Sequence, residues 1–408
     1  MEWPLMTYIH GILVGWYCFM FLLSLYGQYI GQTRYNSKQR SKPKSSQLSA
    51  VEAEGVSILR PLKGIDLELE HNLRSSFTQN YPLFEIIFSV ASADDPVIPI
   101  VKRLMKEYEK TVDSRLIIGE RHVGINPKIN NMMTAYQTAK YDIVWILDSN
   151  VHVERDTLGR SVDQLQLPGT GLVHHLPIAT KPGNYAAEIE HLFLDTNHAK
   201  MYLAINGVGI ASCVVGKSNL YRRSDLDRAT QGVGLEAFGK YMAEDNLIGE
   251  ALWRLGLKHR MSADRACQVL GPISLQGYCA RRARWVRLRK YIVTAATLVE
   301  PMTESIVCGL MGAAGCRYFF HVSMPWFFFF HWSWWFTNDY PHNDKEDALH
   351  HHRRLPWFKF LRAWVSREVL ALPLYLYAIA GTKISWRDQD YRCISDGSAV
   401  ALFSPPNK

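Results

Sequence analysis

Apolar residues gather near the two ends of the chain, and the middle shows shorter hydrophobic runs separated by polar ones. Residues 8–30 are almost free of charge, and a helix that crosses a bilayer needs about 20 such residues. The run is too long for the core of a signal peptide, and no basic segment precedes it. We therefore expect a retained transmembrane anchor over residues 1–32.

A polar, basic segment follows the anchor. Its positive charges are Arg34, Lys38, Arg40, Lys42 and Lys44. Basic residues beside a membrane helix favour the cytosolic side, so the N-terminus is expected in the lumen or outside the cell. The segment over residues 33–54 is predicted to be a cytosolic linker.

The middle of the chain, residues 55–288, alternates short β-branched runs with longer amphipathic stretches. We predict strands at 56–59, 85–90, 115–118 and 143–147, and helices at 67–76, 98–109 and 128–139. Strands that alternate with helices are typical of a parallel sheet in an α/β domain. Ligands of such domains bind beyond the carboxyl ends of the strands, which directs attention to the residues that follow each strand.

The chain becomes apolar again after residue 288. Candidate membrane segments are 291–299 with 305–316, then 318–336, then 365–380, and the second is the longest and cleanest. Acidic residues interrupt the first, so it is interpreted as interfacial or re-entrant. Residues 289–382 are thus expected to form transmembrane or interfacial helices, with a cytosolic loop at 338–362 and a tail at 383–408.

Composition narrows the function classes. The chain has 408 residues and seven scattered cysteines without a C-x-x-C pair, which argues against a disulfide framework or a structural zinc site. The net charge of +8 suits an anionic membrane surface or an anionic substrate. No zinc-finger spacing or pattern for base stacking indicates a nucleic-acid partner. The glycines and lysine of residues 209–217 lack phosphate-loop spacing, and Cys213 beside them reads as a buried thiol.

Two of the predicted strands end at aspartates. Asp94 and Asp95 follow the strand at 85–90, where a carboxylate can bind a nucleobase or ribose, or can simply begin a turn. Asp148 ends the apolar run VWIL, where it can hold Mg²⁺ or Mn²⁺ at a diphosphate, or can cap a helix. For each of these aspartates, the ligand-binding role and the local structural role both remain open.

Two further motifs lie later in the chain. Glu244 and Asp245 precede the helix NLIGEALWRL, where an acid can act as a general base or can stabilise the helix start. The basic run RRARW begins at Arg281, where guanidinium groups can bind a diphosphate or the run can lie on a membrane surface as a basic helix. The histidines at 350–352 are interpreted as a solvated basic loop rather than a metal site.

Taken in order, these motifs resemble those of the ceramide glucosyltransferase family, within the inverting membrane glycosyltransferases of the GT-A fold. The resemblance covers nearly the whole chain. It is carried by SILRPLKGID, VGINPKINNMM, KYDIVWILDSN, AEDN, RRARW and ISWRDQDYR.

The resemblance implies an α/β GT-A catalytic domain that transfers glucose from UDP-glucose to the primary hydroxyl of ceramide with inversion. It implies a divalent cation, Mg²⁺ or Mn²⁺, and a Golgi or endoplasmic reticulum membrane with the catalytic domain facing the cytosol. The implied roles are nucleotide binding for Asp95, metal binding for Asp148, the catalytic base for Asp245 and a place near the active site for His198. The diphosphate contacts are implied for Arg281, Arg284 and Trp285, with Lys63 and Lys128 meeting the donor.

The chain departs from the family pattern at two points. Ser149 and Asn150 leave no D-x-D metal motif, so a metal would depend more on phosphate oxygens. Asn246 stands where the family often has an aromatic residue, which changes the acceptor side. Two rival functions remain open on the sequence: a processive polysaccharide synthase, which would need more membrane helices, and an inactive scaffold that binds lipid through its basic face.

Overall fold

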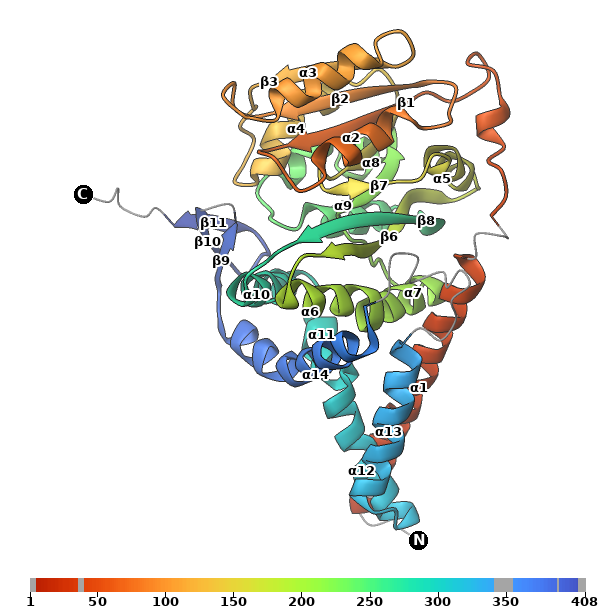
Figure 1. The fold of residues 1–408 in the computed structure, drawn as a ribbon, viewed down its shortest axis with the longest axis vertical. Helices are drawn as coiled ribbons and strands as arrows, with labels where there is room; N and C mark the ends of the chain where they lie inside the picture. Colours follow the sequence, from red (N-terminus) through yellow and green to blue (C-terminus); the bar gives the residue numbers. More distant parts are fainter. Residues whose placement is uncertain (1–4, 36–39, 341–354, 387–388, 403–408) are drawn as a thin grey trace, which may run out of the picture.

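The computed structural model describes residues 5–35, 40–340, 355–386 and 389–402. A broad α/β body stands on a narrow stalk of helices (Figure 1). The predicted loop at 338–362 lies mostly outside the described residues, and its histidine cluster lies wholly outside them.

The body is built on one eight-stranded sheet of order β3-β2-β1-β4-β7-β6-β8-β5. Strands β1 to β4 pair in parallel, and β7 is antiparallel to both β4 and β6. The strands are β1 (Val56–Leu62), β2 (Phe84–Val90), β3 (Asp113–Ile118), β4 (Ile143–Leu147), β5 (Val151–His152), β6 (Thr170–Pro182), β7 (Ser218–Arg222) and β8 (Lys258–Gly271). The four predicted strands and the α/β class are confirmed, and the mixed second half is a feature that the pattern did not predict.

Both faces of the parallel strands are covered, which explains their continuous apolar runs. Ile58 and Trp145 point into one hydrophobic core, and their neighbours Leu59 and Ile146 point into the other. The covering helices of this half are α2 (Leu69–Phe77), α3 (Ile98–Glu107), α4 (Pro127–Gln137) and α5 (Thr157–Leu165). Three of them match the predicted helices within a few residues.

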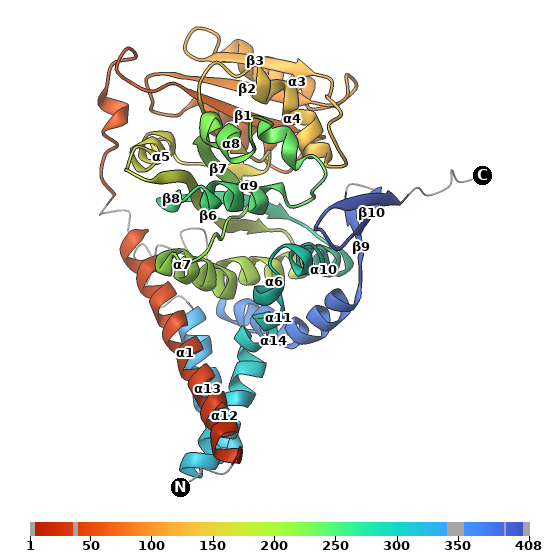
Figure 2. The same cartoon turned by 180° about the vertical axis from the view of Figure 1, so that it is seen from behind.

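The second half of the body adds helices at the edge nearer the stalk (Figure 2). A nearly continuous helical run crosses below β6 and contains one π-helical turn. Its parts are α6 (Tyr185–Phe193), η3 (Leu194–His198) and α7 (Ala199–Val208). The helices α8 (Arg223–Ala229), α9 (Glu244–Arg254) and α10 (Leu275–Ile292) complete the body, with the short turn η4 (Gly234–Phe238) before α9.

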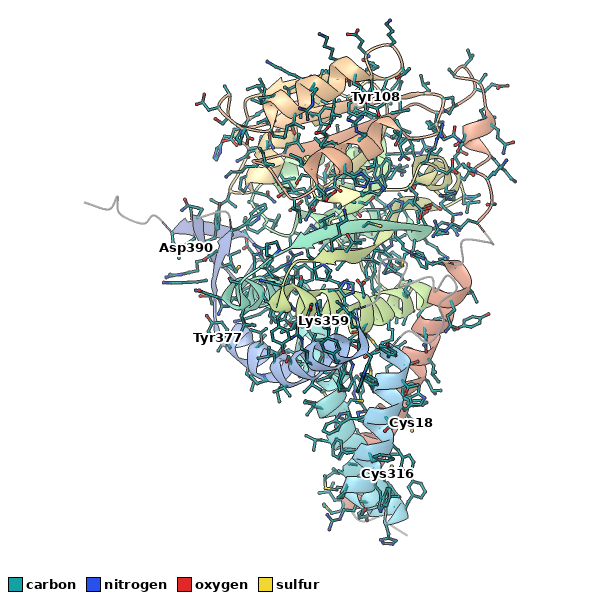
Figure 3. All side chains as sticks on the ribbon, viewed as in Figure 1. Cys18, Tyr108, Cys316, Lys359, Tyr377 and Asp390 are labelled. Carbon is teal, nitrogen blue, oxygen red and sulfur yellow. The ribbon has the colours of Figure 1, made fainter. Side chains whose placement is uncertain are left out.

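The stalk consists of α1 (Leu5–Arg34), α12 (Ser305–Phe320) and α13 (Met324–Asp339). Among the described helices, α1 is long and apolar enough to cross a membrane, and α12 is a shorter apolar helix. Cys18 of α1 and Cys316 of α12 both lie in the narrow part of the stalk (Figure 3).

The prediction of one long segment over 318–336 was wrong. The chain turns between α12 and α13, where His321 has the left-handed φ of 55° that ends a helix. Pro325 then lies in the first turn of α13, where its missing N–H costs nothing. Because aromatic residues flank this turn on both sides, the hydropathy pattern does not reveal it.

The remaining C-terminal elements join the body rather than the stalk. Helix α14 (Trp357–Ala380), which contains the predicted segment 365–380, crosses the base of the body (Figures 1 and 2). The turns α11 (Thr294–Val299) and η5 (Glu300–Thr303) link α10 to α12. Most of the predicted tail forms a three-stranded antiparallel sheet of β9 (Lys383–Trp386), β10 (Gln389–Cys393) and β11 (Ala399–Leu402).

Candidate active site

The end of β4 carries a carboxylate that two lysines hold. Asp148 Oδ1 lies 2.9 Å from Lys128 Nζ, and its Oδ2 lies 3.0 Å from Lys217 Nζ. Lys128 comes from the first turn of α4, whose cap Asn126 accepts the backbone N–H groups of Lys128 and Ile129. Lys217 precedes β7, the strand that pairs with β4, so the antiparallel register brings it beside Asp148.

A second pair of acids meets the same lysine. Lys128 Nζ lies 3.0 Å from Glu244 Oε1, and Asn126 Nδ2 donates to Glu244 Oε2 at 2.8 Å. Glu244 and Asp245 form the first turn of α9, where acidic side chains are favoured by the helix dipole. We call Lys128, Asp148, Lys217, Glu244 and Asp245 the donor cluster.

The backbone at Gly216 leaves room for Asp245. A Cβ atom at residue 216 would lie 2.7 Å from Asp245 Oδ2, closer than any normal contact. The Gly216 carbonyl oxygen also accepts from Lys128 Nζ at 3.5 Å. The loop before β7 therefore fixes both the catalytic-base candidate and the lysine beside it.

The charged groups of the donor cluster shift one another's pKa values. Burial raises the pKa of Asp148, but Lys128 and Lys217 outweigh it and hold that pKa at about 2. Burial lowers the pKa of Lys217, with Asp148 opposing the shift. Burial and the neighbouring Glu244 raise the pKa of Asp245 to about 6, against the effect of Lys128. Asp148 is thus a fixed anion, whereas Asp245 can accept a proton near neutral pH.

Asp95 lies at the same carboxyl-end edge of the sheet but does not contact the donor cluster. Its carboxylate accepts the backbone N–H of Gly64 at 2.9 and 3.0 Å and that of Val97 at 3.0 Å. The loop that contains Gly64 continues to Asp66, which accepts a hydrogen bond from Ser149, the residue after Asp148. The loop of residues 64–66 therefore contacts both Asp95 and the residue that follows Asp148. Lys63 in that loop is exposed and has no place in the cluster.

The arginine-tryptophan motif lies on α10, and its members point in different directions. Arg281 forms an ion pair with the buried Glu190 at 3.0 Å and reaches Gln268 at 3.4 Å. Arg284 donates to the Ser385 carbonyl on β9 at 3.5 Å. In addition to burial, the positive charge of Arg281 lowers the pKa of Lys217, so Arg281 lies on the side of α10 that faces the donor cluster. The structure therefore brings Arg281 toward the cluster, and Arg284 toward the C-terminal sheet.

Trp285 and His198 form an aromatic group beside that motif. Their ring centres are 6.1 Å apart, and the His198 ring stacks on Tyr202 at 5.7 Å. His198 ends the π-helical turn, a feature that often occurs at functional sites. Burial, together with Arg282 and Arg289, lowers the pKa of His198 to about 3, so the ring is neutral.

The C-terminal sheet supports the segment that leads into Asp245. Ser398 bridges Tyr241, and the Ala399 N–H donates to the Lys240 carbonyl at 3.2 Å. Met242 and Ala243 are buried against Tyr391 of β10. The tail of the sequence thus helps to position the start of α9.

Sequence reasoning did not find Lys217 or the contact of Glu244 with Lys128. Lys217 follows an apolar run, CVVG, and directly precedes a strand, which is an unusual place for a lysine. That signal alone could not show which carboxylate the lysine meets, because residues 148 and 217 meet only through the pairing of β4 with β7.

A divalent cation at Asp148 would have to compete with the two lysines that pair with this carboxylate. Both carboxylate oxygens already have an ammonium partner, and a cation bound there would lie against two positive charges. Among the described residues, no group of three or more His, Cys, Asp or Glu side chains is placed to hold a metal ion.

Comparison with known proteins decides the family. The family described as "Glycosyl transferase family 21" matches residues 19–399. The chain belongs to this family. It is therefore a glycosyltransferase, and family membership together with the mixed sheet confirms the expected GT-A class of fold.

Relatives of family 21 match almost the full length. A ceramide glucosyltransferase of Komagataella phaffii is 36% identical and aligns over 96% of this chain and 91% of its own. One from Candida albicans is 31% identical over 94% of each chain, and ceramide glucosyltransferase 3 of Caenorhabditis elegans is 32% identical over 94% of this chain and 81% of its own. A mannosyltransferase of Pyrobaculum calidifontis, solved with GDP-Man and Mn²⁺, aligns over 91% of this chain and 97% of its own at 16% identity and a TM-score of 0.48.

Proposed function

We propose that this glycosyltransferase moves glucose from UDP-glucose to the primary hydroxyl of ceramide with inversion, giving a β-glucoside. The observation that carries the proposal is the contact of the half-buried Lys128 with both Asp148 and Glu244, next to Asp245. This contact places cations for a diphosphate beside a carboxylate that can accept a proton. The names of the relatives in fungi and nematodes support the choice of acceptor and sugar.

The donor would bind along the carboxyl-end edge of the sheet. Asp95, held by two backbone N–H groups, is suited to accept hydrogen bonds from the nucleoside. Lys128 and Lys217 carry flexible point charges that can turn from Asp148 to the diphosphate oxygens. Arg281 adds a planar guanidinium on the same side of α10, next to the face of Trp285.

The transfer step needs a base and a stabilised leaving group. Asp245 takes the proton of the acceptor hydroxyl, whose oxygen forms a bond to the anomeric carbon. The bond from that carbon to the diphosphate oxygen breaks, and UDP leaves with the electron pair. Positive side chains near the diphosphate stabilise the charge that develops there. A general base typically contributes about 10²–10⁴-fold to the rate.

The acceptor would reach this site from the membrane. Helix α1 is long and apolar enough to anchor the protein, and a bilayer around the stalk would lie next to the base of the body. The basic segment after α1 favours a cytosolic body, on a Golgi or endoplasmic reticulum membrane. The binding of Mg²⁺ or Mn²⁺ to Asp148 stays a prediction, and no step above depends on it.

Product analysis tests the proposal directly. The full-length protein in lipid nanodiscs would be given ceramide with an equimolar mixture of UDP-glucose and UDP-galactose, and the lipids analysed by mass spectrometry and NMR. We expect one β-linked glucosylceramide and ceramide-dependent release of UDP. A polymer product, or no UDP release at all, would reject the proposal in favour of a synthase or a scaffold.

A further inference from the structure

A cavity lies against the face of α10 that carries Tyr278, Arg282 and Val286, about a quarter-turn from Arg281, where the body meets the stalk. We call it the interface cavity. It lies between α10, η5 and α14, below the end of α6, and its walls include Phe193, Arg282, Glu300, Glu304, Arg367 and Ala371. Its volume of about 40 Å³ admits a few heavy atoms but no sugar ring.

The charges in the interface cavity balance. Its walls hold two arginines and two glutamates, with Arg367 Nη2 3.0 Å from Glu304 and Arg282 Nη2 4.0 Å from Glu300. One further residue of each sign pairs with these walls. Arg289 forms an ion pair with Glu300 at 2.7 Å, and Glu368 forms one with Arg367 at 2.6 Å. An anion that entered would meet carboxylates without any surplus of positive charge.

Several arginine N–H groups in this cavity have no acceptor. Arg282 is 7% exposed and Arg367 is 2% exposed. Within the described residues, the buried Nη1 of Arg282 and the buried Nε and Nη1 of Arg367 have no hydrogen-bond partner. Leaving such buried donors unpaired costs free energy. A ligand with neutral oxygen atoms would satisfy them without upsetting the charge balance.

The cavity lies where a lipid head group would be found. Its floor, η5, leads directly into α12 of the stalk, which begins at Ser305. One wall is α14, whose opposite face exposes apolar side chains, among them Val369 and Tyr377, as the outward direction of Tyr377 illustrates (Figure 3). The inner wall is apolar at Val286, Ala371 and Leu374. A polar core with apolar walls at this level matches a lipid with hydroxyl and amide groups.

Arg282 connects the interface cavity to the active site. Its guanidinium carbon lies 3.3 Å from the ring centre of Phe193 and 5.0 Å from that of Trp285. Arg281, the preceding residue, lies on the side of the donor cluster, so a single helix separates the two sites. A bound lipid could therefore be held on one side of Trp285 and react on the other.

We propose that the interface cavity binds the amide and secondary hydroxyl oxygens of the lipid acceptor, through Arg282 and Arg367, and thereby orients the primary hydroxyl past Trp285. This inference rests on the proposed function for the identity of the lipid. It assigns acceptor recognition to Arg282, at a variable position of the R-x-x-R-W motif, and to Arg367, which lies outside the motif.

A filled cavity tests the inference without removing a charge. Ala371→Phe places a ring inside the cavity, whereas the control Val369→Phe adds the same ring on the exposed face of α14, where Val369 is 57% exposed. For full-length protein in nanodiscs, we expect Ala371→Phe to raise the KM for short-chain ceramide at least tenfold and to leave the KM for UDP-glucose and the affinity for UDP unchanged. The control should change neither KM. Equal acceptor KM values for Ala371→Phe and wild type would overturn the inference.

A binding measurement separates this inference from the proposed function. Equilibrium dialysis of labelled short-chain ceramide needs no turnover, so binding that Ala371→Phe abolishes would support the cavity even if no glucoside formed. If Ala371→Phe proves unstable, Ala371→Leu is the milder replacement. Phosphatidic acid should not compete with ceramide, because the cavity has no surplus positive charge. Selective competition by phosphatidic acid or by inorganic phosphate would show an anion site and reject the inference.

Discussion

Two groups of charged side chains, the donor cluster and those of the interface cavity, lie near different faces of α10 and differ in how their charges are paired. In the donor cluster two lysines pair with two carboxylates, Asp148 and Glu244, so each ammonium has a partner that a diphosphate can replace. In the interface cavity the arginines keep their glutamates and still have N–H groups to spare. The lysines are flexible point charges that can turn to an anion. The two arginines of the cavity already face two glutamates, so their remaining N–H groups suit a neutral oxygen.

The largest effect is expected when Asp245, the proposed base of the donor cluster, is replaced. Asp245→Asn keeps the shape but cannot take the acceptor proton, so kcat should fall about 10³-fold. The affinity for UDP, measured by calorimetry, and the KM for ceramide should stay near their wild-type values. Because Asn removes an anion that burial and Glu244 destabilise, the melting temperature should not fall. Wild-type turnover would reject Asp245 as the base.

A smaller effect is expected when the cluster loses one lysine. Lys217→Met should lower kcat about 10²-fold, because it removes a charge that stabilises the leaving diphosphate. It also frees Oδ2 of Asp148, so Mn²⁺ binding to donor-free protein, followed by electron paramagnetic resonance, should become tighter. Lys102→Met, an exposed residue of α3, is the matched control and should change neither value. Unchanged Mn²⁺ binding in Lys217→Met would contradict the competition between lysine and metal.

Displacing the base without altering its charge sharpens the comparison. Gly216→Ala introduces a Cβ that must push Asp245 away, so kcat should fall roughly tenfold while the acceptor KM stays unchanged. Gly232→Ala is unsuitable as a control because its φ of 88° strains any side chain. Gly277→Ala, on the far end of α10 with only Ser274 nearby, is a better one. A Gly216→Ala enzyme with normal kcat would show that Asp245 tolerates displacement.

The smallest effect comes from pH. The raised pKa of Asp245 means that this carboxyl becomes protonated as the pH falls through about 6, and a protonated base cannot accept the hydroxyl proton. Activity should therefore be full above neutrality, half-maximal near pH 6, and about tenfold lower for each further pH unit. Asp148, with its pKa near 2, stays ionised throughout this range. A kcat profile that is flat from pH 7 to 5 would contradict this assignment.

The contrast between the two halves of the sheet explains which parts of the fold could be predicted. Strands β1 to β4 are short apolar runs joined by nearby helices, so local pattern and connection length were sufficient. Strands β6 and β8 pair in parallel from residues almost 90 positions apart, and β7 enters between them and β4 in the opposite direction. No local pattern records such pairings, because they depend on which edges of the growing sheet are still free.

The same reasoning separates the site residues. The candidates Asp95, Asp148 and Asp245 could be chosen from the sequence because each follows a strand or begins a helix, a position that local pattern reveals. Their neighbours could not be chosen in this way. Lys217 reaches Asp148 through strand pairing, and Arg367 joins Arg282 only because α14 folds back beneath α10.

By itself the sequence determined the long apolar helix α1, the α/β domain, the order of the chemical motifs and the membership of a glycosyltransferase family, since each of these is encoded in short stretches of neighbouring residues. Only the tertiary structure decided the turn at His321, the place of α14 under the body, the lysine contacts of Asp148 and the cavity beside Arg282. These features arise from contacts between distant segments. A charged group buried in such a contact is paired, because burying it unpaired costs free energy.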